Sequence, residues 1–314
     1  MGVAVNLAWT KTLWARVAVA ALGLGALVWL LQGLDLARIT RAWAAAPAWV
    51  WPLSVLGMVG SHVLRGGRMR AEWRTRLHMD WSTAWALVVR HSAWVVLAPM
   101  RGGEGVYLWA LKNQGDVPYK ESAMSLLKLR LQDMAVLGVL GVAAFTPVSW
   151  PLRLGLALLA LVMAMWILPL AWRWLVARAR AKGKAPERMP AAATLESWFF
   201  ALSNWVVKLA AIALPLWVLI DASADAAWRG ALGGELAAAM PFQPPAGLGP
   251  YEAGVWAGIR SAADLPVADV AAAALTVHVL MLLTTVASAT FARALGWSAR
   301  DYRRAELECV GPLA

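Results

Sequence analysis

The chain of 314 residues is 61% hydrophobic and 15% charged, with a mean hydropathy of +0.60 and a formal net charge of +11. This composition is that of a polytopic membrane protein and excludes a soluble globular one. The basic residues lie mainly in short segments between apolar runs, so we expect them to orient the chain in the bilayer rather than to bind nucleic acid. The single cysteine, Cys309, leaves no disulfide framework or cysteine-based metal site, and no cofactor is expected.

Six apolar runs have the roughly 20 residues that a helix needs to cross a bilayer. They are residues 12–32, 46–64, 122–147, 152–172, 194–220 and 267–293. We take the first run as a retained helix, because no small-residue cleavage site of a signal peptide follows it. The sequence therefore predicts an all-α polytopic membrane protein with about six full transmembrane helices.

Two further apolar segments, 82–112 and 228–263, are each interrupted by proline, glycine and charged residues. The interruptions are at 99–104 and 244–252, and both end in a glutamate. Backbone groups left unpaired at membrane depth are tolerated only inside protein or around a water-filled cavity. We therefore expect two re-entrant hairpins whose tips form a functional site. The alternative is that each segment contains two complete but short spans.

Charge predicts the direction in which each hairpin enters. Clusters of Lys and Arg at 65–76 and 173–188 are expected in cytoplasmic loops, whereas the aspartates at 221–225 and 264–269 are expected on the opposite side. The first hairpin must then enter and leave on the cytoplasmic side. By the same argument the second hairpin must enter and leave on the outside.

The two halves of the chain, 12–147 and 152–293, then share the order span, span, hairpin, span but run in opposite directions. This is an inverted-topology repeat within one integral membrane domain of residues 1–314, which ends in a cytoplasmic tail at 294–314. In such repeats broken helices meet near the midplane around the substrate. We expect both hairpin tips to line one cavity and both termini to be cytoplasmic.

Each hairpin tip is followed by a predicted helix start, at Glu104 after two glycines and near Tyr251 after a Gly-Pro pair. The free N–H groups and the positive dipole of a helix start suit phosphate or carboxylate oxygens. Glu104 and Glu252 either complement their own helix dipoles or have partners inside the membrane, where an isolated carboxylate is costly. Arg101 is the nearest candidate partner for Glu104.

Further charged residues lie within the predicted spans. Arg130 and Asp133 are three residues apart and share a helix face, so they form either a structural ion pair or, with Lys128, a cationic lining for a lipid headgroup. Lys208 lies similarly deep. The lone histidines are expected to be hydrogen-bonded core residues, because no spacing among them makes a metal site. These histidines are His62, His91 and His278.

Four motifs of this chain carry a family resemblance. They are Pro-x-Arg-x-Gly-Glu at Pro99, Arg101, Gly103 and Glu104, Arg-x-x-Asp at Arg130 and Asp133, Trp-x-x-Lys at Trp205 and Lys208, and Gly-Leu-Gly-x-x-Glu at Gly247, Leu248, Gly249 and Glu252. In this order they resemble the transmembrane region of bacterial lysylphosphatidylglycerol synthases, over roughly residues 10–300. Two departures from the family pattern, Leu129 and Tyr251, alter the polarity of the site.

The hairpin argument and the motifs together predict a substrate-binding site. Its members are Arg101, Gly103, Glu104, Arg130, Asp133, Lys208, Gly247, Gly249 and Glu252. In two-domain members of the family this region is regarded as a lipid flippase, while a soluble domain makes the aminoacyl lipid. No soluble domain is expected here, so the resemblance implies translocation without synthesis in a bacterial inner membrane.

The expected partners are the bilayer and a lipid with an anionic or polar headgroup, such as a phospholipid, an aminoacylated lipid, or a polyprenyl- or hopanoid-linked headgroup. Its acyl chains would stay in the bilayer. One alternative is an intramembrane enzyme that modifies a headgroup, with Glu104, Glu252 or a histidine as acid or base. The other is a membrane scaffold for a glycosyltransferase or another lipid-modifying enzyme.

Overall fold

The protein is described by a computed structural model in which residues 36–97, 103–183, 185–186, 188, 190–240, 244–297 and 303–304 are placed. The first half contains α2 (Leu36–Ala45), α3 (Val50–Trp73), β1 (Leu77–His78), α4 (Trp81–Leu97), α5 (Glu104–Gly115) and α6 (Tyr119–Phe145). The second half contains α7 (Trp150–Ala181), α8 (Leu195–Ile220), α9 (Ala224–Ala238), the 3-10 turn η2 (Pro245–Gly247), α10 (Pro250–Arg260), α11 (Val267–Ala294) and β2 (Arg303–Arg304). The predicted span at 12–32 lies outside the described residues.

The all-α membrane fold is confirmed. Among the described residues, α7, α8 and α11 are long and apolar enough to cross a membrane, while the two short strands only pair with each other. The number of six full spans stays a prediction. The helix α2 was not predicted, and it brings Trp43 into a stacked contact with Trp51 of α3, with ring centroids 4.3 Å apart.

Both broken segments fold as pairs of short helices. The first hairpin consists of α4 and α5, with 17 and 12 residues, and the second consists of α9 and α10, with 15 and 11 residues. At 1.5 Å per residue these helices are about 17–26 Å long, less than the roughly 30 Å of a bilayer core. Their lengths favour re-entrant hairpins over complete short spans.

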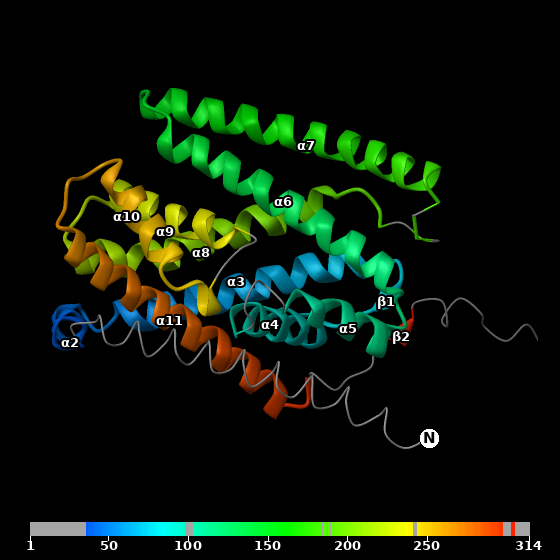
Figure 1. The fold of residues 1–314 in the computed structure, drawn as a ribbon, viewed down its shortest axis with the longest axis horizontal. Coiled ribbons are helices and arrows are strands. Elements are labelled where there is room, and N and C mark those ends of the chain that lie inside the picture. Colours follow the sequence, from blue (N-terminus) through cyan, green and yellow to red (C-terminus); the bar gives the residue numbers. More distant parts are fainter. Residues whose placement is uncertain are drawn as a thin grey trace, which may run out of the picture.

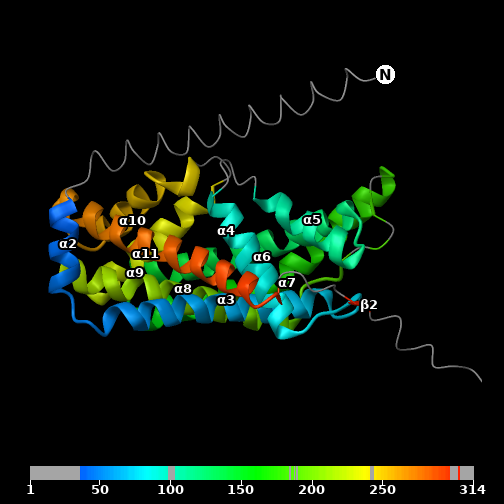
Figure 2. The same cartoon turned by 90° about the horizontal axis from the view of Figure 1, so that it is seen from below.

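The hairpins approach the middle of the molecule from opposite ends. Figure 1 shows the first hairpin joined to β1 and α6 at one end, whereas the turn between α10 and α11 lies at the other end. Figure 2 shows α5 and α10 on the same face of the molecule, opposite α3. The helix α4 contacts η2, so the two tips meet.

Small residues allow the helices of the second hairpin to pack at backbone distance. A Cβ atom on Gly254 would lie 2.4 Å from the carbonyl oxygen of Gly233, and one on Gly258 would lie 2.1 Å from the carbonyl oxygen of Arg229. Real Cβ atoms do not approach so closely, so any larger residue would push α9 and α10 apart. Glycines four residues apart are a common device for close helix pairs in membranes.

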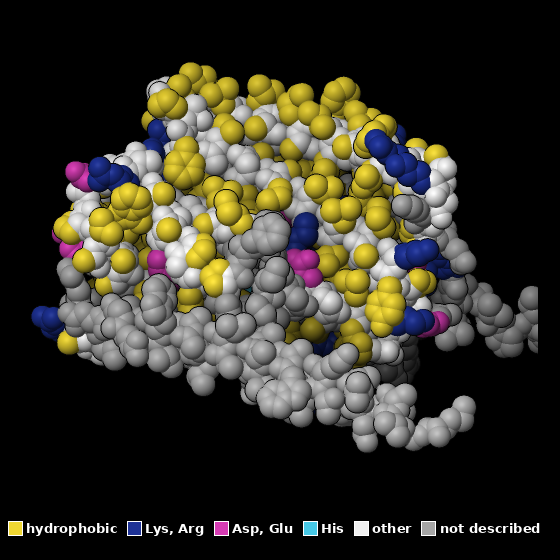
Figure 3. Space-filling model, viewed as in Figure 1, with side chains coloured by type: hydrophobic (Ala, Val, Ile, Leu, Met, Phe, Trp, Pro, Cys, Tyr) yellow, Lys and Arg dark blue, Asp and Glu magenta, His cyan; other side chains and the backbone are white. Residues whose placement is uncertain are grey.

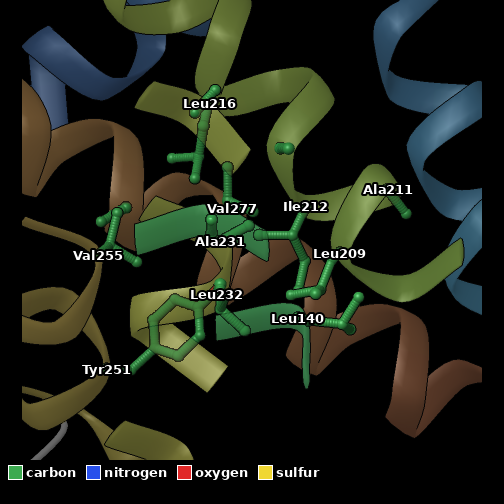
Figure 4. Close-up of a cluster of buried hydrophobic side chains, with 14 of the residues drawn as sticks. Leu140, Leu209, Ala211, Ile212, Leu216, Ala231, Leu232, Tyr251, Val255 and Val277 are labelled. Atoms are coloured by element: carbon green, nitrogen blue, oxygen red, sulfur yellow. The ribbon is translucent and has the colours of Figure 1, made fainter. Parts of the chain in front are cut away.

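The apolar core surrounds the second hairpin. Its largest cluster combines residues of α6, α8, α9, α10 and α11, including Leu209, Ile212, Leu232 and Val255 (Figure 4). A smaller cluster joins α3, α4 and α5 near β1. Each hairpin is therefore fixed at one end of the molecule, and its tip reaches toward the middle.

Two basic clusters that were predicted to be loops lie largely in helices. The helix α3 continues to Trp73, so Arg65 and Arg68 belong to it, and α7 continues to Ala181 and includes the arginines before that residue. The prediction for α3 was wrong because Arg68, which is 4% exposed, finds partners on α6. Its guanidinium donates to Asp133 Oδ1 at 2.6 Å and to the carbonyl oxygen of Leu129 at 2.7 Å. A charge in a span is tolerated when it is paired in this way.

The helix α7 presents most of its apolar side chains outward. Only 6% of the residues in its most apolar stretch are buried, and Trp150, Leu158 and Trp166 are more than 60% exposed. Figure 3 shows hydrophobic side chains covering this edge of the molecule. An exposed apolar surface of this length is expected to face lipid.

Candidate functional site

One cavity of about 450 Å³ lies where the two hairpin tips meet. Polar and charged side chains from both hairpins and from α3, α6, α8 and α11 line it. They include His62, Arg65, His91, Ser92, Glu104, Arg130, Asp133, Asn204, Lys208, Glu235, Tyr251 and His278. The shared cavity that the inverted repeat predicted is therefore present between the hairpins.

Five of the predicted site residues line this cavity, namely Glu104, Arg130, Asp133, Lys208 and Gly247. Gly103 and Glu252 are next in sequence to the lining residues Glu104 and Tyr251, and Gly249 lies two residues after Gly247, but none of the three lines the cavity itself. Arg101 lies outside the described residues, so the predicted pair of Arg101 with Glu104 is not described.

At the first tip, Glu104 begins α5 and its carboxylate lies 3.0 Å from the guanidinium of Arg130 on α6. These two side chains are 31% and 27% exposed. Asp133 accepts from Arg68 and from the indole N–H of Trp205, at 2.6 and 3.0 Å. Arg130 and Asp133 therefore form ion pairs with residues of other helices. The sequence had suggested an ion pair between these two residues, along α6.

The prediction that Lys128 belongs to the same cationic lining was wrong, because Lys128 does not line the cavity. Its ammonium lies 2.5 Å from Glu72 and donates to the carbonyl oxygen of Ala191 at 2.6 Å. Ser125 donates to the same carboxylate at 2.6 Å, and its hydroxyl bonds Tyr107 at 3.1 Å. This buried network joins α3, α5, α6 and the segment before α8 beside β1, away from the cavity.

At the second tip the backbone itself requires glycine. Gly247 and Gly249 have φ angles of 71° and 93°, which side-chain-bearing residues rarely adopt. The N–H of Gly249 donates to Glu252 Oε2 at 2.6 Å, and Glu252 Oε1 lies 2.6 Å from Nδ1 of His278. Glu252 therefore both caps α10, as one of its two predicted roles required, and fixes a histidine of the cavity wall.

Lys208 of α8 points to the second hairpin, where its ammonium lies 2.6 Å from Glu235 Oε2. Glu235 is 4% exposed, and the sequence analysis did not select it. The sequence signal that could have identified Glu235 is its position as a single acidic residue within the apolar second half of α9. The three histidines were assigned to the core, but all of them line the cavity, and His278 has the expected hydrogen bond.

Several polar atoms of the cavity wall are buried without a hydrogen-bond partner in the protein. These atoms are His62 Nδ1, Asn204 Oδ1, Glu235 Oε1 and the hydroxyl of Tyr251. A buried polar group left unsatisfied costs about 1–3 kcal/mol. The wall is therefore built to bind water or the polar part of a ligand, and within the described residues no group of His, Cys, Asp and Glu is arranged to hold a metal ion.

The cavity reaches the surface near the middle of α6. Its more exposed lining residues include Glu104, Arg130, Met134 and Pro244, and the two on α6 lie near the middle of that helix. Figure 3 shows a basic and an acidic side chain lying together near the centre of this face, with hydrophobic side chains among those coloured around them. A polar group could enter here while an attached chain stays on the apolar surface.

A family model described as the lysylphosphatidylglycerol synthase TM region matches residues 13–289. The chain belongs to this family. The part of this chain that matches the lysylphosphatidylglycerol synthase TM region includes both hairpins and every residue that lines the cavity. A search of curated proteins found no match. Membership indicates a membrane protein with a lipid-related role.

Proposed function

We propose that this protein moves a lipid with a polar headgroup between the leaflets of the bacterial inner membrane. The observation that carries the proposal is the cavity of about 450 Å³, which is lined by charged and polar side chains from both hairpins and reaches the surface midway along α6, beside hydrophobic side chains. Moving a polar headgroup through hydrocarbon is costly because its hydrogen bonds and charges lose water. A polar cavity at this depth lowers that cost while the acyl chains stay in the bilayer.

The two hairpins supply a route for alternating access. They enter from opposite ends and meet at their tips, so a small movement of either hairpin would open the cavity toward its own side. The ion pairs Glu104–Arg130 and Lys208–Glu235 join each hairpin to a neighbouring helix. A headgroup phosphate that binds Arg130 would weaken the first pair and release the first hairpin.

The distribution of charged residues between the two ends of the molecule supports the membrane orientation that the sequence predicted. The ends of α3 and α7, directly before Arg74 and Lys182, lie at the end of the molecule that carries β1, while the end of α8, directly before Asp221, and the turn between α10 and α11, which contains Asp264, lie at the other end. The end with β1 would be cytoplasmic because basic segments stay inside. The first hairpin would then give access from the cytoplasm and the second from the outside.

Reconstitution into liposomes tests the proposal. Purified protein should speed the exchange of a short-chain fluorescent phospholipid between leaflets, measured by quenching from the outside. Arg130→Gln should lower that rate at least about tenfold, as expected for loss of one charge-assisted contact. Arg260→Gln removes an exposed ion pair with Asp264 and is the matched control, with an unchanged rate. Exchange no faster than in empty liposomes for every lipid class tried would refute transport.

One observation favours a second candidate, an intramembrane enzyme. The ring of His278 lines the cavity, and its Nδ1 is held at 2.6 Å by the carboxylate of Glu252. A histidine oriented by a carboxylate is a common general base. Release or modification of a headgroup by purified protein, detected by mass spectrometry and abolished by His278→Gln, would select this candidate over transport.

A further inference from the structure

The two halves of the cavity wall differ in the chemistry that they offer a headgroup. Among the described residues beside the first hairpin, the cations Arg65, Arg68 and Arg130 line the cavity or the small pocket next to it together with two carboxylates, those of Glu104 and Asp133. Arg65 is bonded to the neutral hydroxyl of Ser92 at 3.0 Å. The described side chains of this half therefore carry one positive charge in excess, which suits a phosphate group.

Beside the second hairpin the wall has no such excess. Its described ammonium, that of Lys208, is matched by Glu235 at 2.6 Å. What remains are buried acceptor atoms and a hydroxyl without protein partners, Asn204 Oδ1, Glu235 Oε1 and the hydroxyl of Tyr251. Their residues are 2%, 4% and 1% exposed, so none of them is open to bulk water.

We propose that the headgroup is a phosphate joined to a polyol, either glycerol or a sugar. The phosphate binds Arg65 and Arg130, and the polyol hydroxyls bind Asn204, Glu235 and Tyr251. Two hydroxyls of one polyol can donate one hydrogen bond each to Asn204 Oδ1 and Glu235 Oε1, and either can accept from the phenol of Tyr251, so together they satisfy all three groups. The inference rests on the proposed function, because it assigns the substrate class of the same cavity.

The same atoms disfavour an ammonium headgroup. The charge of the Glu235 carboxylate is already balanced by Lys208, whose ammonium also lies 5.2 Å from the ring of Trp205. A second ammonium bound at Glu235 would meet that of Lys208 within the same buried pocket, where like charges repel strongly. The cavity volume of about 450 Å³ is within the range of sites that bind small ligands, so a phosphate with one small polyol is a suitable occupant.

Binding of defined lipids to the purified full-length protein tests this assignment. The dissociation constants would be measured from the rise in unfolding temperature with lipid concentration. The probes are short-chain phosphatidylglycerol, a polyprenyl phosphate hexose, phosphatidic acid, which has the phosphate without a polyol, and phosphatidylethanolamine, which carries an ammonium. Two variants, Tyr251→Phe and Asn204→Leu, remove polyol contacts, and Arg65→Gln removes a phosphate contact.

A polyol phosphate should bind at least about tenfold more tightly than phosphatidic acid, since several hydrogen bonds distinguish them. Tyr251→Phe and Asn204→Leu should each lower that ratio about fivefold, which is the value of one neutral hydrogen bond. Arg65→Gln should weaken binding of all phosphate lipids without changing the ratio. Thr276→Val is the matched control, because Thr276 also has a buried hydroxyl without a partner but does not line the cavity.

Equal affinity for phosphatidic acid and both polyol lipids, or tighter binding of phosphatidylethanolamine, would overturn the assignment. An unchanged ratio in both Tyr251→Phe and Asn204→Leu would do the same. Tighter binding of the glycerol lipid or of the hexose lipid supports the class and identifies its source. Selective binding of a polyol lipid together with no exchange between leaflets would refute transport and leave the headgroup assignment standing.

Discussion

Removing Asp133 should destabilise the protein strongly, because Asp133 neutralises Arg68 inside the membrane. The two side chains are 9% and 5% exposed, and their atoms lie 2.6 Å apart. Removing one partner of a buried ion pair costs about 3–5 kcal/mol. Arg68 keeps two other acceptors, Gln132 Oε1 at 3.0 Å and the carbonyl oxygen of Leu129, so we expect Asp133→Ala to cost about 3 kcal/mol.

The measurement is thermal unfolding of purified protein in one detergent. A loss of about 3 kcal/mol corresponds to a Tm lower by roughly 6–12 °C for a domain of this size. The double variant Arg68→Met/Asp133→Leu should recover most of that loss, since apolar residues of similar volume replace a buried pair at little cost. Asp264→Ala, which removes an exposed pair with Arg260, is the control and should change stability by less than about 1 kcal/mol.

A double variant no more stable than Asp133→Ala would refute this reasoning. It would mean that the loss comes from the missing partner of the Trp205 indole N–H, 3.0 Å from Asp133, and not from the uncompensated charge of Arg68. A single variant with an unchanged Tm would show that Arg68 reaches water from its position on α3.

Two further predictions concern packing and orientation. Gly254→Ala should lower the Tm, because its Cβ would lie 2.4 Å from the carbonyl oxygen of Gly233. Gly141→Ala in α6 is the control, since its Cβ meets open space and the change should be neutral or stabilising. Equal effects of the two changes on the Tm would refute the close packing of the second hairpin. In a cysteine-free background, a cysteine at exposed Asp264 should react with an impermeant thiol reagent added outside, and one at exposed Lys182 should react only after permeabilisation. The reverse labelling pattern would invert the assigned orientation.

The hairpins could be predicted from the sequence because their signals are local. Two glycines before Glu104 and a Gly-Pro pair before Tyr251 predicted helix starts, and α5 and α10 begin at Glu104 and Pro250. The position at which a helix begins depends mostly on the residues at that end. The meeting of the two tips followed from charge and hydropathy, since opposite entry brings both to the same depth.

The partners inside the membrane could not be predicted in this way. Arg68 looked like a loop residue because the carboxylate that neutralises it, Asp133, lies 65 residues later on another helix. Glu235 was missed for the same reason, since Lys208 is a partner only after α8 and α9 are packed together. Periodicity and local charge say which residues are costly in lipid, but only the tertiary arrangement says what compensates them.

The helix α7 affects the insertion of the whole chain into the membrane more through its presence than through its particular side chains. Because its apolar side chains mostly face outward, α7 should accept exchanges among Leu, Val, Ile and Met with little effect on folding. Deleting α7 would have a large effect, because α7 is the predicted first pass of the second half and sets the direction in which the rest of that half inserts. A chain with α7 deleted would insert the second half in the reverse sense. Both hairpins would then enter from one leaflet, and the polar groups of each tip would have no counterpart at the depth where they now meet.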